Sequence, residues 1–125
     1  MKQIAIFAPY KIGIMEVPEP KPTSKQIKTK TRVVGISIGT ELHDYRGSMA
    51  RIPEKWKLIH PYTFPVFPGY LNVGRVTEIG NEIKDVKLGD RVVHEGPDAE
   101  YCCVPRDEAL PVYLRIPDSI SDEDA

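Results

Sequence analysis

Residues Gln26–Val34 read QIKTKTRVV, and this stretch indicates the fold class more clearly than any other. The odd positions from Ile27 to Val33 would face one side of an extended backbone, and the even positions from Lys28 to Val34 would face the other. A period of two residues is typical of a β-strand. We therefore expect a strand here.

Further short strands are expected on both sides of this stretch. Twelve prolines and nine glycines divide the chain into pieces that are mostly too short for amphipathic helices. The segment VPEPKP (17–22) favours an extended connector, and TELHDYRG (40–47) would form one or two helical turns ending at Gly47. The other strands are expected at residues 2–7, 11–17, 72–79, 91–94 and 99–104. The chain therefore reads as mainly β, with the strands in a compact barrel or sandwich.

The composition fits one soluble domain spanning residues 1–125. Lysine and arginine total 17 against 18 acidic residues, so the net charge of −1 gives no field for nucleic acid or an anionic membrane. Hydrophobic residues make up 41% of the chain, and their runs are too short to span a bilayer. The start MKQIAIFAPYKIG lacks the pattern of a secretory signal. We expect no nucleic-acid partner, no membrane partner and a cytoplasmic location.

The last residues, PDSISDEDA (117–125), resemble the beginning of a helix. Ser121 would be the N-cap, and three acidic residues follow it in the first turn, where the helix dipole favours negative charge. This signal at 121–125 suggests that the parent chain continues, as an excised domain or as half of a split protein. A solvated acidic terminus is the alternative.

Four sequence segments resemble a known family, and their order along the chain is stronger evidence than any single segment. They are GISIGTELHDYRG (35–47), FPVFPGYLNVGRVTEIGNEIKDVKLGDRVV (64–93), DAEYCCVP (98–105) and RIPDSISDEDA (115–125). Together they resemble the N-terminal domain of the medium-chain dehydrogenase/reductase superfamily, of the zinc alcohol dehydrogenase type. The resemblance implies a GroES-like, partly open β-barrel with short helices. It also implies a Rossmann domain that binds NAD or NADP, which would be missing from this chain or separate from it, since no GxGxxG turn occurs here.

The family's zinc positions hold other residue types in this chain. The resemblance places Ile38 where the family has a zinc-binding cysteine, and Tyr70 and Leu71 where it has histidine and glutamate. An alkyl chain cannot bind zinc, and a neutral phenol is a poor substitute for imidazole. Catalytic zinc is therefore not expected, and the chain resembles the zinc-lacking members. His60, His94 and Glu95 share no established ligand spacing and are interpreted as surface residues.

The resemblance also suggests catalytic residues. Thr40 and His43 match positions that relay a proton from the substrate oxygen to solvent. Glu41 matches an acidic position that orients the metal-bound imidazole in zinc enzymes, and without metal it would contact substrate or accept a hydrogen bond from Tyr70. Tyr45 and Tyr70 are candidates to donate a hydrogen bond to a carbonyl oxygen. The alternatives are a surface histidine at the end of a short helix and two tyrosines that pack at a barrel rim.

Aromatic residues in and beside the proline-rich stretch 48–68 would line a substrate pocket or a small satellite core. They are Trp56, Phe64 and Phe67. The sequence thus predicts the substrate-binding part of an NAD(P)-dependent, zinc-independent alcohol dehydrogenase-like oxidoreductase, which acts on a carbonyl or alcohol substrate and is inactive alone. It would pair with a Rossmann domain in cis or in trans, and an uncovered face would favour a homodimer. A non-enzymatic GroES-like interaction or assembly module is the alternative.

Overall fold

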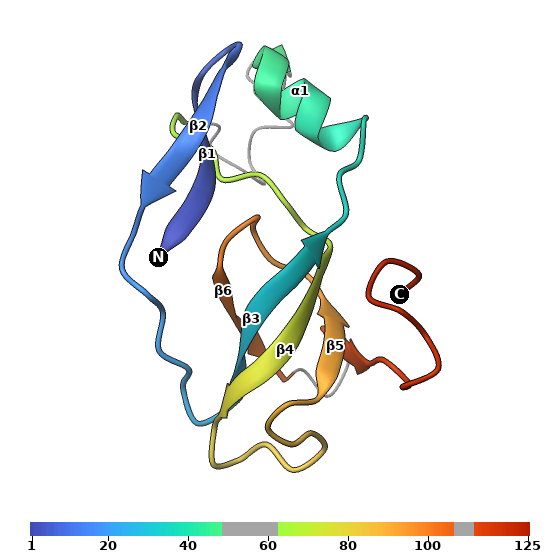
Figure 1. Ribbon diagram of the computed structural model, residues 1–125. Coiled ribbons are helices and arrows are strands. Elements are labelled where there is room, and N and C mark those ends of the chain that lie inside the picture. The colour runs from blue at the N-terminus through green and yellow to red at the C-terminus, as the bar shows by residue number, and fades with distance from the viewer. Residues whose placement is uncertain (49–62, 107–111) are drawn as a thin grey trace, which may run out of the picture.

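The computed structural model describes residues 1–48, 63–106 and 112–125. Strands dominate these residues, as the sequence predicts, and one short helix accompanies them (Figure 1). The elements are β1 (Lys2–Ala8), β2 (Lys11–Glu16), β3 (Gln26–Val34), α1 (Thr40–Arg46), β4 (Asn72–Ile79), β5 (Arg91–His94), β6 (Tyr101–Pro105) and β7 (Tyr113–Arg115).

The strands form a five-stranded antiparallel sheet and a separate hairpin. The sheet has the order β6-β3-β4-β5-β7, and β1 pairs with β2. Two single bridges, Gln3 to Ala99 and Ile6 to Val66, connect the hairpin to segments that flank the sheet strands. Figure 1 shows the hairpin and α1 at the same end of the sheet, beyond the end of β3. This end holds the candidate site.

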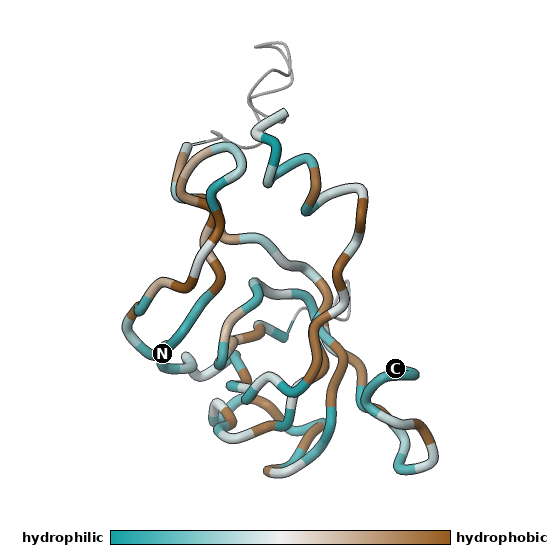
Figure 2. Tube along the Cα trace, turned by 45° about the horizontal axis from the view of Figure 1, so that its top comes forward, coloured by the Kyte–Doolittle hydropathy of each residue, from teal (hydrophilic) through white to brown (hydrophobic). Residues whose placement is uncertain are grey.

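The core lies on the inner face of the sheet and beneath its loops. Figure 2 shows hydrophobic residues along the central strands. The main cluster of buried residues contains Ile27, Val76, Ile83, Val92, Ala99, Cys102, Val104 and Tyr113. The alternating pattern buries Ile27, Val76, Val92 and Val104 from four neighbouring strands, which explains why these strands form one layer.

All the expected strands are present, and in three of them the observed bounds differ from the predicted ones by one or two residues. Strand β7 was not predicted, because three residues provide too little alternation to recognise. The predicted alternation in β3 fails at Lys28, which is buried although its position would face outward. Its ammonium group bonds the carboxylates of Glu19 and Glu78 and lies 5.1 Å from the Tyr101 ring centroid. The hydrogen bonds to Glu19 and then to Glu78 raise the pKa of Lys28 despite its burial.

The segment after β7 returns along the sheet and is held by an arginine. The Arg91 guanidinium donates to Asp122 Oδ1 at 2.8 Å, to the Pro117 carbonyl at 2.8 Å and to the Ile120 carbonyl at 2.6 Å. The Ser121 hydroxyl accepts a hydrogen bond from the Asp124 N–H at 3.2 Å. This contact is the one expected of an N-cap, although residues 117–124 lie in turns and bends rather than in a helix.

Among the described residues, no helix has the length and hydrophobicity needed to cross a bilayer.

Candidate functional site

The register of β3 against β4 brings two of the sequence blocks together. Val34 lies opposite Asn72, and the Gly35 N–H then donates to the Leu71 carbonyl at 2.9 Å. Gly35 and Leu71 therefore lie side by side, and the segments 35–38 and 69–71 both adjoin the same end of the sheet. The sequence predicted the strands, and their pairing explains why these distant blocks share one site.

Helix α1 begins after the first of these blocks and ends where the sequence predicts. Gly47 adopts a φ of 66° as the C-cap, and its N–H donates to the Asp44 carbonyl at 3.0 Å. A Cβ atom at Gly47 would lie 2.7 Å from Pro9 Cγ. Glycine is therefore needed both for the left-handed backbone and for the close approach of the hairpin.

Glu41 lies in the first turn of α1 with one of its oxygen atoms partnered. Its Oε2 accepts a hydrogen bond from the Ser37 N–H at 3.0 Å, and the Glu41 N–H donates to the Ser37 carbonyl at 3.3 Å. This local pair takes the place of the contact with Tyr70 that we considered from the sequence. Its other oxygen, Oε1, is buried without a hydrogen-bond partner among the described residues.

Asp98 lies against Glu41, and the sequence did not single it out. The residue is only 8% exposed, and its Oδ1 has no hydrogen-bond partner in the part of the chain that the structure describes. Its backbone N–H donates to the Pro68 carbonyl, and its carbonyl accepts from the Ile4 N–H, both at 2.9 Å. Burial, and then the nearby charge of Glu41, raise the pKa of Asp98.

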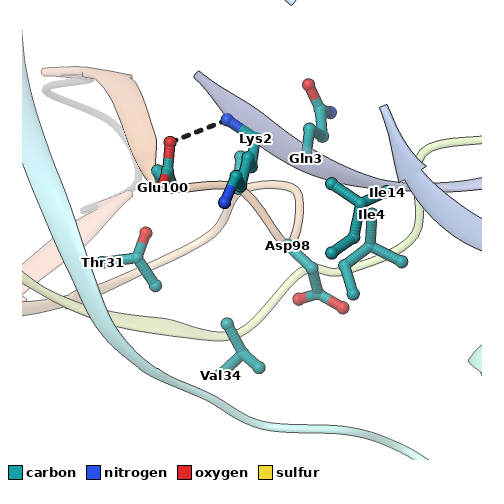
Figure 3. Close-up of a pocket in the computed structure, with 9 residues that line it drawn as sticks. Lys2, Gln3, Ile4, Ile14, Thr31, Val34, Asp98 and Glu100 are labelled. Carbon is teal, nitrogen blue, oxygen red and sulfur yellow. Dashed lines mark hydrogen bonds between the residues drawn. The ribbon is translucent and has the colours of Figure 1, made fainter. Parts of the chain in front are cut away.

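Two cavities meet at Asp98 and Ile4. The smaller has a volume of about 110 Å³, and Glu41 and Asp98 are its acidic residues. Its remaining lining residues are Ile4, Ile6, Ile12, Ile36 and Pro68. The larger cavity, of about 300 Å³, lies between the hairpin and strand β3, and Figure 3 shows the Asp98 carboxyl group projecting into it between Ile4 and Val34.

The predicted site residues fall into two groups. Thr40, Glu41, His43 and Tyr45 share α1, whereas Phe67 and Tyr70 belong to the segment before β4. Trp56 lies outside the described residues, as does His60.

Three predicted catalytic residues have neighbours that limit their roles. Thr40 and His43 are exposed, and the His43 Nδ1 lies 2.8 Å from the Ser48 hydroxyl. Tyr45 packs edge-on against Tyr10, with 5.5 Å between the ring centroids, as in the packing alternative. His43 thus stays open to solvent, and the Tyr45 ring is packed against Tyr10.

The aromatic residues near the sheet end are partly open to solvent. Tyr70 is 42% exposed, and Phe67 is exposed to a similar extent. The Gly35–Leu71 hydrogen bond keeps Tyr70 at the end of the sheet from which α1 also departs. Tyr70 is therefore accessible to a molecule that occupies this end of the domain.

The residues at the family's zinc positions do not fit zinc. Ile38 carries no lone pair and is 81% exposed, and the phenol of Tyr70 is a weak ligand when neutral. Within the described ranges, no three His, Cys, Asp or Glu side chains are close enough to hold a metal ion together. These positions therefore offer zinc no suitable set of ligands.

The interpretation of His94 as a surface residue is wrong. His94 is 3% exposed; its Nε2 lies 2.9 Å from the Thr29 hydroxyl, and its Nδ1 lies 2.9 Å from the Glu95 carbonyl. Because a carbonyl only accepts, Nδ1 carries the proton and Thr29 donates to Nε2. Burial lowers the pKa of His94. The contact passes over Gly74 of the intervening strand, where a Cβ atom would lie 3.3 Å from Nε2.

Sequence comparison finds dehydrogenases, whereas no protein-family model matches the chain. The (R,R)-butanediol dehydrogenase of Bacillus subtilis is 38% identical over 85 residues, covering 67% of this chain and 24% of that protein. The L-threonine 3-dehydrogenase of Photorhabdus laumondii is 30% identical over an alignment of 141 positions, covering 90% of this chain and 38% of that protein. The chain thus spans well under half the length of these relatives.

Solved structures give the same fold. The alcohol dehydrogenase of Thermus sp. ATN1 superposes on 98% of this chain and 42% of its own, with a TM-score of 0.77 and 21% identity. The Escherichia coli quinone oxidoreductase complexed with NADPH covers 98% of this chain and 35% of its own, with a TM-score of 0.72 and 20% identity. Together with the four ordered blocks, these matches show that the chain belongs to the medium-chain dehydrogenase/reductase superfamily and corresponds to its N-terminal GroES-like domain.

Proposed function

We propose that the chain is the substrate-side domain of an NAD(P)-dependent alcohol dehydrogenase-like oxidoreductase that works without catalytic zinc. The observation that carries this proposal is the meeting of Ile36, Glu41, Pro68 and Asp98 around an apolar cavity at one end of the sheet. Such a cavity with a few polar groups is the usual form of a small-molecule site.

The relatives support the reaction class. Their names describe dehydrogenases of butanediol, sorbitol, threonine and other alcohols, and two of the similar structures are complexed with NADPH. We infer that the substrate of this protein is a small alcohol or the corresponding carbonyl compound. Because the chain spans only 24% and 38% of two relatives, a nucleotide-binding domain, joined or separate, would supply NAD or NADP.

The exposed wall of the site would receive that domain. Ile36 and Ile38 are 72% and 81% exposed, and Leu71, which neighbours Gly35, is also exposed. An apolar surface of this kind favours association, either with the nucleotide-binding domain or, in its absence, with a second copy of the chain.

The chain's own residues would position the substrate and move a proton. The nicotinamide supplies or accepts hydride when bound. The Tyr70 hydroxyl would donate to the substrate oxygen as negative charge develops there, and the exposed Thr40 and His43, with Ser48 beside His43, would connect that oxygen with solvent.

Binding and turnover with two protein preparations test this proposal. The isolated chain should neither bind NADPH, followed by nicotinamide fluorescence, nor oxidise it with aldehydes, ketones or quinones. The chain joined to or mixed with the nucleotide-binding domain encoded nearest to it should do both, without added zinc. NADPH binding by the isolated chain would contradict this division of labour, and a seven-fold ring in native mass spectrometry would favour the assembly module instead.

A further inference from the structure

Strand β2 has a row of backbone groups without hydrogen-bond partners. The N–H groups of Ile4 and Ile6 donate to segments on the far side of β1, at 2.9 and 2.8 Å, so these residues do not bond β2. Ile14 and Ile12 lie directly opposite them, and their backbone groups therefore point away from β1. Among the described residues, neither Ile12 nor Ile14 has a partner for its N–H or carbonyl. Figure 1 shows β2 on the outer side of the hairpin.

The side chains along this free edge are apolar and open to solvent. Ile12 is 53% exposed and Ile14 is 65% exposed. Proteins usually block an exposed strand edge with proline or with charged side chains, because the edge otherwise pairs with another strand. The outer strand β6 of the main sheet ends in Pro105, which has no N–H. Residues 12–15 contain neither a proline nor a charge, so the edge of β2 is not protected in this way.

We propose that β2 pairs with β2 of a second copy of the chain, antiparallel, around a two-fold axis at Gly13. In this register Ile12 lies opposite the partner's Ile14, and the two residues exchange both of their backbone hydrogen bonds. The symmetry repeats this pair on the other side of the axis. Four isoleucine side chains then meet on one face of a continuous sheet.

The sequence of β2 suits this pairing with itself. An axis two residues further along the ladder, at Ile14, would instead place Ile12 opposite the partner's Glu16, a carboxylate beside an alkyl side chain. In the register centred on Gly13, Glu16 stays beside Lys2, its cross-strand neighbour in the same copy. Two hairpins joined in this way form one four-stranded sheet with a shared apolar face, which is more stable than an isolated pair of strands.

The second copy would contribute to the candidate site. Ile12 lines the smaller cavity and Ile14 lines the larger one, so the partner's isoleucines would extend the apolar wall of both. This interface differs from the exposed wall proposed for the nucleotide-binding domain, because Ile38 and Leu71 line neither cavity. The inference does not depend on the proposed oxidoreductase function.

A cysteine at the two-fold axis tests the register. Residue 13 would face its own counterpart in a non-hydrogen-bonded pair, where the Cα atoms lie about 4.5 Å apart and a disulfide can form. In a Cys103→Ser background, where the buried Cys102 is the remaining thiol, Gly13→Cys should give a disulfide-linked dimer with oxidised glutathione. Lys11→Cys is the matched control. It lies on the same face but opposite the partner's Met15, too far from its counterpart, and should give no such dimer.

Sedimentation equilibrium of the chain measures the association itself. Ile14→Lys should weaken self-association by about tenfold or more, because it places two ammonium groups in the apolar cluster. Leu88→Lys is the matched control, since Leu88 is 66% exposed and lies outside the hairpin, and it should associate like the unmodified chain. Circular dichroism checks that each variant is folded.

Three outcomes would overturn the inference. They are a monomer at the highest soluble concentration, equal cross-linking of Lys11→Cys and Gly13→Cys, and a dimer that a folded Ile14→Lys variant leaves intact. If Ile38→Lys abolishes the dimer and Ile14→Lys does not, the second copy occupies the exposed wall instead. None of these measurements uses NADPH or a substrate, so their failure leaves the proposed function untouched.

Discussion

At Gly69 the backbone has a φ of 108° and passes so close to Asp98 that a Cβ atom would lie 2.4 Å from Oδ1 and 2.5 Å from the Asp98 backbone nitrogen. Residue 69 thereby determines how deeply the carboxyl group is enclosed. Glycine is required at position 69 for two reasons. A positive φ disfavours any side chain, and the Asp98 backbone cannot move away from an added Cβ without a cost in free energy.

Gly69→Ala should therefore destabilise the fold by about 3 kcal/mol or more, because strain and overpacking add. Urea unfolding followed by circular dichroism measures this change. Gly89→Ala is the matched control: φ is 86° there, but no atom lies within 4 Å of the added Cβ, so the cost should be only about 1 kcal/mol. Equal costs for the two variants would show that the contact with Asp98 is not tight.

The zinc positions can be tested by restoring the family's ligand types. The triple variant I38C/Y70H/L71E should bind Co²⁺ and give a thiolate-to-metal absorption band, whereas the unmodified chain should give none. The reason is the register that places Gly35 beside Leu71, so that the segments carrying these three positions adjoin the same end of the sheet. Absence of the band in a folded triple variant, with a native circular dichroism spectrum, would mean that these positions do not converge.

The family resemblance, together with the residue types, predicted the differences at the zinc positions, but it did not reveal Asp98. Its role depends on Pro68 and Ile4, which hold its backbone from two other parts of the chain. No local pattern in the sequence carries such a contact. His94 is different, because it lies two residues after the buried Val92 on the same face of a strand. The period of two carried a signal for its burial, which the interpretation of His94 as a surface residue did not use.

At the scale of the elements, strands β3, β4 and β5 are connected by a hydrogen bond that crosses the middle strand. Thr29 on β3 reaches His94 on β5 because Gly74 on β4 has no side chain. The pair buries two polar groups and satisfies both. The neutral imidazole is the form that fits, with its proton on Nδ1 facing the Glu95 carbonyl.

Stability should consequently fall as the pH drops below about 6.5, the ordinary pKa of histidine. Burial lowers the pKa of His94 in the folded chain, so the unfolded chain binds the proton first, and the folded state loses free energy relative to it until the folded pKa is reached. Urea midpoints at pH 7.5 and 5.5 measure the slope. His94→Gln should reduce that slope. Thr29→Val should lower stability at both pH values and leave the slope unchanged. An unchanged slope in His94→Gln would contradict the assignment of the pH dependence to His94.

The strand elements were predictable to the extent that their signal is local. The alternation in Gln26–Val34 and the helix end at Gly47 follow from neighbouring residues, and both are confirmed. The burial of Lys28 was not predictable, because it requires Glu19 from the connector and Glu78 from β4 to meet at one ammonium group. Long-range pairing of charges leaves no periodic trace in a sequence.

At the scale of the whole molecule, two arginines connect the sheet to the segment that follows it, and Arg91 makes most of the contacts. Arg91 on β5 is mostly buried and contacts Asp122 and two carbonyl groups, and Arg32 on β3 also bonds Asp122. These contacts lower the pKa of Asp122, with Arg32 as the largest cause. The segment thus lies against the sheet through polar contacts rather than through a large apolar surface.

Arg91→Met should release this segment without unfolding the domain. Hydrogen exchange measured by mass spectrometry should become about tenfold faster or more in residues 117–124, because three hydrogen bonds are lost, and should change little in β3 and β4. Arg115→Met is the control, since Arg115 is exposed and its side chain makes a 3.4 Å contact with Asp90 and no contact with residues 117–124 among the ion pairs of the described ranges. Unchanged exchange in Arg91→Met would show that other contacts hold the segment.

The pairing of Val34 with Asn72 also limits which kinds of mutation this protein can accumulate. Side chains at the end of the sheet can be exchanged, as Ile38 and Tyr70 illustrate, because the backbone ladder between β3 and β4 does not depend on them. Gain or loss of a single codon within either strand would instead shift that ladder by one position and turn the following side chains to the opposite face, unless the change were absorbed by a bulge like the two irregularities already present at Lys28/Thr29 and Thr31/Val33. Evolution or engineering of new activity on this domain should therefore proceed by replacement at the sheet end, with changes of length confined to the connections outside β3 and β4.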